Sequence, residues 1–212
     1  MTRPIAQASS LVERLERLGH EAVVCPLISL EPLGHEPIDL APYDWVVLTS
    51  ANGAEELARR RAGRLPRVAA IGPGTAAALR RHGIAVDLVP AVSTQEGLVA
   101  AFPPSPGLVL VAAAEQARPY LARMLGAEFV ALYRTVEIVP EEAPDGDLAL
   151  LTSASAARVF ASLRTGIPAV SIGPETTKAA RLGGVPVLAE AQTHDLDGLV
   201  AALEQARRAE QG

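Results

Sequence analysis

Two stretches of this chain combine a glycine–proline corner with a hydroxyl residue in the same order. Val68–Thr75 is Val-Ala-Ala-Ile-Gly-Pro-Gly-Thr, and Ala169–Thr176 is Ala-Val-Ser-Ile-Gly-Pro-Glu-Thr. In each, an apolar run that stops at Gly-Pro predicts a buried strand and a tight turn, and an alanine-rich helix follows. The unpaired backbone N–H groups at such a helix start are able to hold an anion. Each corner is therefore either an anion-binding site or simply the start of a helix.

A second pair of matching stretches ends in hydroxyl residues. Asp44–Gly53 and Asp147–Ser155 both predict a buried strand that ends in Thr-Ser. A third pair, Thr94–Val99 and Thr193–Val200, predicts the start of a helix in both places. Because the three motifs recur in one order, we infer an internal duplication.

The elements that position these residues alternate between strands and helices, which predicts parallel sheets covered on both faces. Ligands bind beyond the carboxyl ends of the strands in such sheets. If two domains present those ends toward each other, we expect a cleft lined by hydroxyls and backbone amides. The candidate binding residues are Ser50, Asn52, Gly72, Thr75, Ser153, Ser155, Gly173 and Thr176. Each hydroxyl among them is either a helix cap or a ligand contact.

Further elements are expected outside the repeated motifs. The apolar spacing predicts a helix over 6–18, a strand over 22–25, a helix over 115–125 and a strand over 128–132. Proline-bounded extended segments are expected over 26–37 and 133–144. Tyr133 stands where a strand enters the second of these segments. A phenol beside a bound polyanion keeps its proton at neutral pH, so Tyr133 is a candidate proton donor. The alternative is a tyrosine that only packs against a linker.

Composition excludes several classes of function. The 212 residues carry a net charge of −5, and 49% are hydrophobic but only 3% aromatic. An acidic chain without basic clusters interleaved with aromatics is not expected to bind nucleic acid. No long apolar run or secretion signal is present, so we expect a cytoplasmic protein without membrane contact. Cys25 is the only cysteine, which leaves no internal disulfide, and no metal-binding or nucleotide-binding motif is found.

The ordered motifs resemble those of the uroporphyrinogen-III synthase family over almost the whole chain. The matching residues are Thr2-Arg-Pro, Pro26-Leu-Ile, Leu48-Thr-Ser-Ala-Asn, Ile71-Gly-Pro-Gly-Thr, Leu132-Tyr-Arg-Thr, Leu151-Thr-Ser-Ala-Ser, Ile172-Gly-Pro-Glu-Thr and Ala189-Glu-Ala-Gln-Thr.

The resemblance implies two similar flavodoxin-like α/β domains with parallel sheets, joined by a two-stranded antiparallel linker. One domain is expected to comprise residues 1–27 and 140–212, and the other residues 38–133. The linker strands are then 28–37 and 134–139. A simple division near Pro104 is the alternative that composition alone leaves open.

The resemblance also implies an activity. The family converts hydroxymethylbilane, a linear tetrapyrrole polycarboxylate, to uroporphyrinogen III with loss of water, ring closure and inversion of the last pyrrole through a spiro intermediate. No cofactor or metal is implied, and we expect a monomer. Tyr133 occupies the position of the family's favoured candidate for assisting departure of the hydroxyl. Ser50, Thr75, Ser153 and Thr176 occupy positions associated with substrate contacts.

Two departures from the family pattern leave alternatives open. A full strand usually precedes the Thr-Arg-Pro stretch, so the first strand of one sheet is expected to be short or missing. Ala113 and Ala114 stand where the family often has a basic residue and glycine. A non-catalytic tetrapyrrole-binding or regulatory module on the same scaffold, or a binding protein for another small anion, are the alternative functions.

Overall fold

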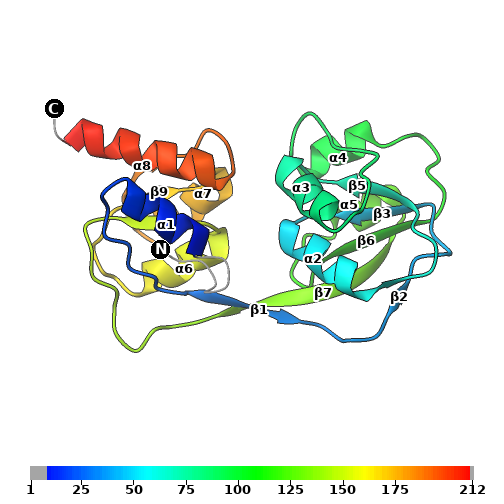
Figure 1. The fold of residues 1–212 in the computed structure, drawn as a ribbon, viewed down its shortest axis with the longest axis horizontal. Coiled ribbons are helices and arrows are strands. Elements are labelled where there is room, and N and C mark those ends of the chain that lie inside the picture. The colour runs from blue at the N-terminus through cyan, green and yellow to red at the C-terminus, as the bar shows by residue number, and fades with distance from the viewer. Residues whose placement is uncertain (1–8, 211–212) are drawn as a thin grey trace. The chain divides into compact units, whose positions relative to one another are not determined.

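The computed structural model describes residues 9–210, and it divides into two compact units (Figure 1). The first unit contains the chain up to Leu30 and again from Val136 onward, and the second contains Glu31–Thr135. Both boundaries fall inside strands, namely β1 (Ile28–Pro32) and β7 (Glu128–Glu137). The Thr-Arg-Pro stretch and the expected first strand lie outside the described residues.

The second unit contains a sheet in the order β1-β7-β6-β3-β5. Its core strands β3 (Trp45–Leu48), β5 (Arg67–Ala70), β6 (Val109–Ala114) and β7 pair in parallel. Next to β5, Leu88 forms only a single parallel bridge with Ala69. A separate two-stranded ladder joins β2 (Ile38–Asp39) to β4 (Arg61–Ala62).

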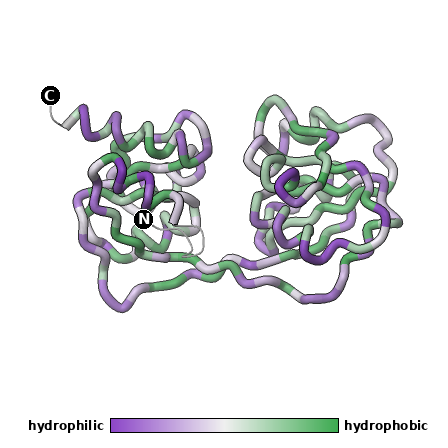
Figure 2. Tube along the Cα trace, in the orientation of Figure 1, coloured by the Kyte–Doolittle hydropathy of each residue, from purple (hydrophilic) through white to green (hydrophobic). Residues whose placement is uncertain are grey.

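Helices cover both faces of this sheet because its side chains alternate with period two. On one face, Val47, Ala69 and Val111 pack with residues of α4 (Gln95–Ala101) and α5 (Tyr120–Leu125). On the other face, α2 (Ala51–Arg60) and α3 (Pro73–Arg81) contact β3, β5 and β6. Figure 2 shows hydrophobic stretches along the central strands and more hydrophilic ones in the outer helices and loops.

The first unit is also a three-layer α/β structure. Its parallel sheet has the order β10-β9-β8, formed by Val187–Glu190, Ala169–Ser171 and Ala149–Leu151. The helices α6 (Ala154–Ser162) and α7 (Pro174–Leu182) pack on one face, and α1 (Ser9–Arg17) and α8 (Leu196–Glu210) on the other. The mixed α/β class with mainly parallel sheets is therefore confirmed.

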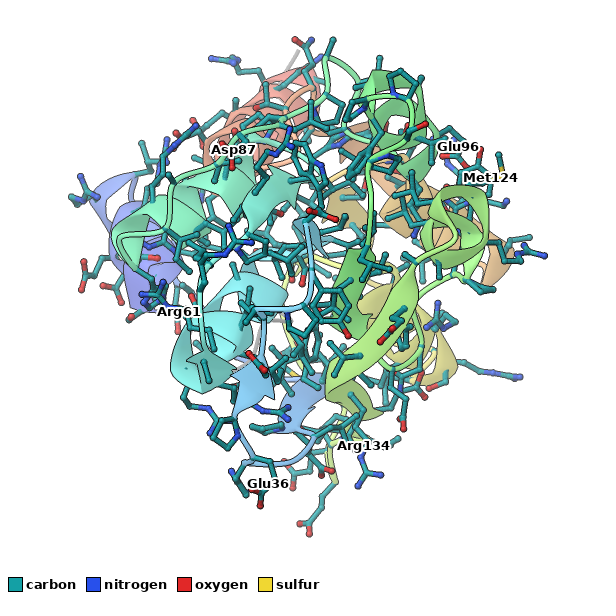
Figure 3. All side chains as sticks on the ribbon, turned by 90° about the vertical axis from the view of Figure 1, so that its right-hand side faces the viewer. Glu36, Arg61, Asp87, Glu96, Met124 and Arg134 are labelled. Atoms are coloured by element: carbon teal, nitrogen blue, oxygen red, sulfur yellow. The ribbon has the colours of Figure 1, made fainter. Side chains whose placement is uncertain are left out.

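β1 and β7 are neighbours and run antiparallel. The Leu33 N–H donates to the Leu132 carbonyl at 2.8 Å, and the Ile138 N–H donates to the Leu27 carbonyl at 2.9 Å. From the first bond to the second, the β1 side goes back from Leu33 to Leu27 while the β7 side advances from Leu132 to Ile138, so the two strands are antiparallel. Arg134 and Glu31 add an exposed ion pair at 2.7 Å, and Figure 3 shows Arg134 at the edge of the second unit.

Three expected elements are wrong in part. Residues 22–25 form no strand, and Val23 and Val24 are exposed there instead of being buried against a sheet. The helix expected over 115–125 begins only at Tyr120, because Pro119 disfavours helical geometry in the residue before it. The strand expected over 128–132 continues through Tyr133 to Glu137 as β7, so no break separates it from the extended segment expected from residue 133.

Candidate functional site

Tyr133, Ser50 and Asn52 come together at the carboxyl edge of the second unit's sheet. Ser50 follows β3, and Tyr133 lies in β7 opposite Ala114, just past an irregularity in the pairing of β6 with β7. The Tyr133 hydroxyl lies 2.9 Å from Ser50 Oγ and also forms a hydrogen bond with the Asn52 side chain. Tyr133 is 83 residues from Ser50 in the sequence, and the parallel sheet brings it to the same edge as Ser50 and Asn52.

The environment of Tyr133 keeps its phenol protonated. The side chain is 7% exposed. Burial raises the pKa of Tyr133 above its ordinary value, and the hydrogen bonds from Ser50 and Asn52 offset part of that rise. A neutral, nearly buried phenol that retains hydrogen-bond partners is suited to give a proton to a reacting group.

Ser50 has a second role as the N-cap of α2. Its Oγ accepts a hydrogen bond from the Gly53 N–H at 3.0 Å. Ser153 caps α6 in the same way, with the Ala156 N–H at 3.1 Å. The cap interpretation is therefore correct for both serines, and for Ser50 it coexists with the contact to Tyr133.

The two glycine–proline corners are different, because no side chain caps the helices that start there. α3 begins at Pro73 after Gly72, and α7 begins at Pro174 after Gly173. Proline suits the first helical position, which is why both helices begin earlier than the alanine-rich pattern suggests. Pro73 and Pro174 have no N–H, and the Thr176 N–H already donates to the Gly173 carbonyl at 3.1 Å. Among the described residues, the N–H groups of Gly74 and Thr75 in α3 and of Glu175 in α7 form no hydrogen bond, so they are left for solvent or a ligand.

Thr75 and Thr176 lie in the first turns of these two uncapped helices. Their side chains are 6% and 4% exposed, and neither hydroxyl forms a hydrogen bond within the part of the chain that the structure describes. A hydroxyl next to free N–H groups is a suitable partner for a carboxylate. Ser155, by contrast, accepts a hydrogen bond from Arg158 at 3.0 Å, so part of its capacity is already used.

The sequence analysis missed one residue beside each corner. A β-carbon on Gly72 would lie 2.7 Å from Ser93 Oγ, and one on Gly173 would lie 2.9 Å from His194 Cδ2. Glycine is required at both positions because these side chains pack directly against the backbone. Ser93 and His194 each precede the N-cap position of the repeated third motif, at Thr94 and at Asp195, which is the signal that would have identified them.

Asp44 has a structural role just before β3. Its Oδ2 accepts the Leu108 N–H at 2.9 Å at the beginning of the strands, remote from their carboxyl ends. Within residues 9–210 no group of three or more histidine, cysteine or acidic side chains is arranged to hold a metal ion. No helix in that range is both long and apolar enough to span a bilayer.

Comparison with known proteins identifies the family. The family model described as "Uroporphyrinogen-III synthase HemD" matches residues 9–201. The chain belongs to the uroporphyrinogen-III synthase family. A uroporphyrinogen-III synthase of Synechococcus elongatus is 29% identical, over 96% of this chain and 93% of the relative. Another relative, from Ruminiclostridium josui, is a porphyrin biosynthesis protein HemD with 29% identity over 92% of this chain.

Solved structures of the family share the fold. A mutant uroporphyrinogen III synthase from Thermus thermophilus matches with a TM-score of 0.65 and 16% identity, over 97% of both chains. A uroporphyrinogen-III synthetase from Helicobacter pylori matches with a TM-score of 0.57 and 17% identity, over 88% of this chain and 96% of that one. These structures show the shared fold, and the family model and the named relatives confirm the family expected from the motifs, and with it an enzyme of tetrapyrrole biosynthesis.

Proposed function

We propose that this protein converts hydroxymethylbilane to uroporphyrinogen III, with loss of water, ring closure and inversion of the last pyrrole through a spiro intermediate. Family membership and the named relatives support the activity. The observation that carries the mechanism is the buried Tyr133 phenol held by Ser50 and Asn52.

Tyr133 is the proposed proton donor for the first step. The C–O bond to the departing hydroxyl breaks as the phenol gives up its proton, so that water leaves and a phenolate and an azafulvenium cation remain. Because burial raises the pKa of Tyr133, the proton is present at neutral pH. The terminal pyrrole releases a proton when the ring closes and aromaticity returns, and the Tyr133 phenolate is the group proposed to accept it.

Binding of the substrate is assigned to the uncapped helix starts. Beside Gly72, the second unit offers the Gly74 and Thr75 N–H groups and the Thr75 hydroxyl. Beside Gly173, the first unit offers the Glu175 N–H and the Thr176 hydroxyl. Such neutral donors bind carboxylates without arginine or lysine side chains. They can therefore serve a polycarboxylate even though the chain carries a net charge of −5. Ser153 and Ser155 complete the proposed binding set in the first unit.

The architecture proposed with this function is a pair of duplicated, flavodoxin-like domains. The supporting features are the repeated serine N-caps and the repeated uncapped Gly-Pro corners. The proposed domains are 1–27 with 140–212 and 38–133, and the linker strands are 28–37 and 134–139. We propose a monomer that acts in the cytoplasm and needs no cofactor.

The test is an isomer assay with hydroxymethylbilane and the intact protein. The expected product is the type III isomer, whereas ring closure without enzyme gives type I. Formation of type I alone would refute the proposed function. Saturable binding of uroporphyrinogen without turnover would instead support the non-catalytic module, for which Ala113 and Ala114 are the relevant departure.

A further inference from the structure

The imidazole of His194 lies directly against the Gly173 corner of the first unit. A β-carbon on Gly173 would lie 2.9 Å from His194 Cδ2 and 3.2 Å from His194 Nε2. This edge of the ring therefore faces the backbone at the uncapped start of α7. His194 is exposed, and it forms no hydrogen bond or ion pair with the part of the chain that the structure describes. Both ring nitrogens are thus available to a ligand bound at this corner.

The Gly173 corner also presents a backbone donor and a hydroxyl to solvent. The Glu175 N–H forms no hydrogen bond among the described residues. Thr176 is only 4% exposed, and its hydroxyl has no partner there either. The enclosed side-chain atoms without a partner in residues 9–210 are Trp45 Nε1 and Gln95 Oε1, so the Thr176 oxygen is open to solvent. An N–H group and an open hydroxyl at a helix start are suited to hold a carboxylate.

The matching corner of the second unit shows what is particular to this one. The first turn of α7 leaves fewer N–H groups unbonded than that of α3, because the Thr176 N–H donates to the Gly173 carbonyl at 3.1 Å. The residue that packs on the corner glycine also differs, being Ser93 in the second unit and His194 in the first. Histidine donates from at least one ring nitrogen in either protonation state. The first unit therefore has an imidazole donor where its helix offers fewer backbone donors.

Two acidic side chains stand close to the Gly173 corner in the sequence. Glu175 is exposed in the first turn of α7. Asp195 follows His194, and its Oδ1 is occupied by the Gly198 N–H at 2.7 Å. Like charges repel a substrate carboxylate, whereas a hydrogen bond to that carboxylate is stronger than one between neutral groups. An additional donor at the corner therefore has a clear effect on binding.

We propose that His194 is a substrate-binding residue whose Nε2 donates a hydrogen bond to a substrate carboxylate at the Gly173 corner. This inference rests on the proposed function, because it takes its ligand to be the same polycarboxylate tetrapyrrole. His194 then acts with the Glu175 N–H and the Thr176 hydroxyl on one carboxylate, whose two oxygens accept about four hydrogen bonds. Because it binds a carboxylate and not the reacting atoms, His194 contributes to KM and leaves kcat unchanged.

The test compares two substitutions of His194 in the isomer assay. His194→Leu keeps the bulk of the side chain and removes both ring nitrogens, whereas His194→Gln keeps an N–H donor near the place of Nε2. We expect His194→Leu to raise KM for hydroxymethylbilane about tenfold at unchanged kcat, and His194→Gln to stay within about threefold of the wild-type KM. Wild-type KM in folded His194→Leu would overturn the inference. An equal rise of KM in both variants would assign the ring to packing and would overturn it too.

The matched control is His35→Leu. His35 is exposed, and it adjoins Glu36, whose carbonyl accepts Arg60 Nε–H at 2.9 Å at the end of α2 that is remote from the carboxyl edge. This control should keep the wild-type KM, and a rise equal to that in His194→Leu would overturn the inference. If His194→Leu does not fold, His194→Ala replaces it with the same expected results.

Failure of the proposed function is recognised separately. If the wild type yields only the type I isomer, the proposed function fails, and calorimetry with uroporphyrinogen III then tests His194. Binding about tenfold weaker in His194→Leu than in the wild type would support the inference. Equal affinity of the two proteins, or no binding by the wild type, would overturn it.

Discussion

Replacing Tyr133 with phenylalanine removes one oxygen and leaves the ring in place. The variant loses the 2.9 Å hydrogen bond to Ser50 and the one to Asn52. Ser50 keeps its bond from the Gly53 N–H at 3.0 Å, so the cap of α2 survives. We therefore expect only about 1 kcal/mol of lost stability. If the phenol is the general acid, kcat should fall by roughly 10²- to 10⁴-fold with little change in KM.

The assay follows formation of the type III isomer under saturating hydroxymethylbilane, together with thermal unfolding of each variant. Tyr43→Phe is the matched control, because the Tyr43 hydroxyl donates to Glu128 at 2.6 Å at the beginning of β7, remote from the carboxyl edge. That control should keep the wild-type kcat. Unchanged kcat in Tyr133→Phe would remove Tyr133 from the chemistry, and an equal loss in Tyr43→Phe would show that the assay reports stability.

Three other outcomes follow from the same contacts. Ser50→Ala and Ser153→Ala should each cost about 1 kcal/mol of stability in denaturant unfolding, because each removes an N-cap. Only Ser50→Ala should also lower kcat, and equal kcat values in the two variants would contradict the second role of Ser50. Thr75→Val and Thr176→Val should change stability by less than about 0.5 kcal/mol and raise KM by about tenfold, since neither hydroxyl has a partner among the described residues. An unchanged KM would show that neither hydroxyl contacts the substrate. Because burial raises the pKa of Tyr133 in the folded protein, its stabilising effect is complete below the unfolded value near pH 10 and is lost as the pH rises through the folded value. The wild type should therefore lose stability relative to Tyr133→Phe above about pH 10, and a constant difference up to higher pH would contradict the shift.

The sequence predicted the repeated parts of the fold because they depend on local rules. Ser50 and Ser153 follow four-residue and three-residue buried strands and cap helices, as serine after an apolar run does. The Gly-Pro corners were predicted because an apolar run that stops at Gly-Pro is typical of a strand followed by a tight turn. The helix expected from residue 115 was wrong in its first half because a proline inside an apolar pattern outweighs periodicity.

What the sequence did not reveal depends on contacts between distant segments. The resemblance implied paired linker strands, but the local sequence did not show that β7 runs without a break from Glu128 to Glu137 with Tyr133 inside it, which depends on its pairing with β1. The packing of Ser93 on Gly72 depends on how a loop folds over a sheet edge. Hydrophobic periodicity carries no information on either.

The difference between the two capping serines indicates where the chemistry is located. Both serines accept a backbone N–H, yet only Ser50 also meets a tyrosine, while Ser153 has no other hydrogen bond within the described residues. Tyr133 reaches Ser50 because β7 extends past the bulge in its pairing with β6. Under the proposed function, both edges bind carboxylates, and the extended strand β7 adds the proposed proton donor to only one of them. It follows that substitutions at Thr176 or Ser153 should affect KM, whereas loss of kcat at constant KM should be confined to the second unit.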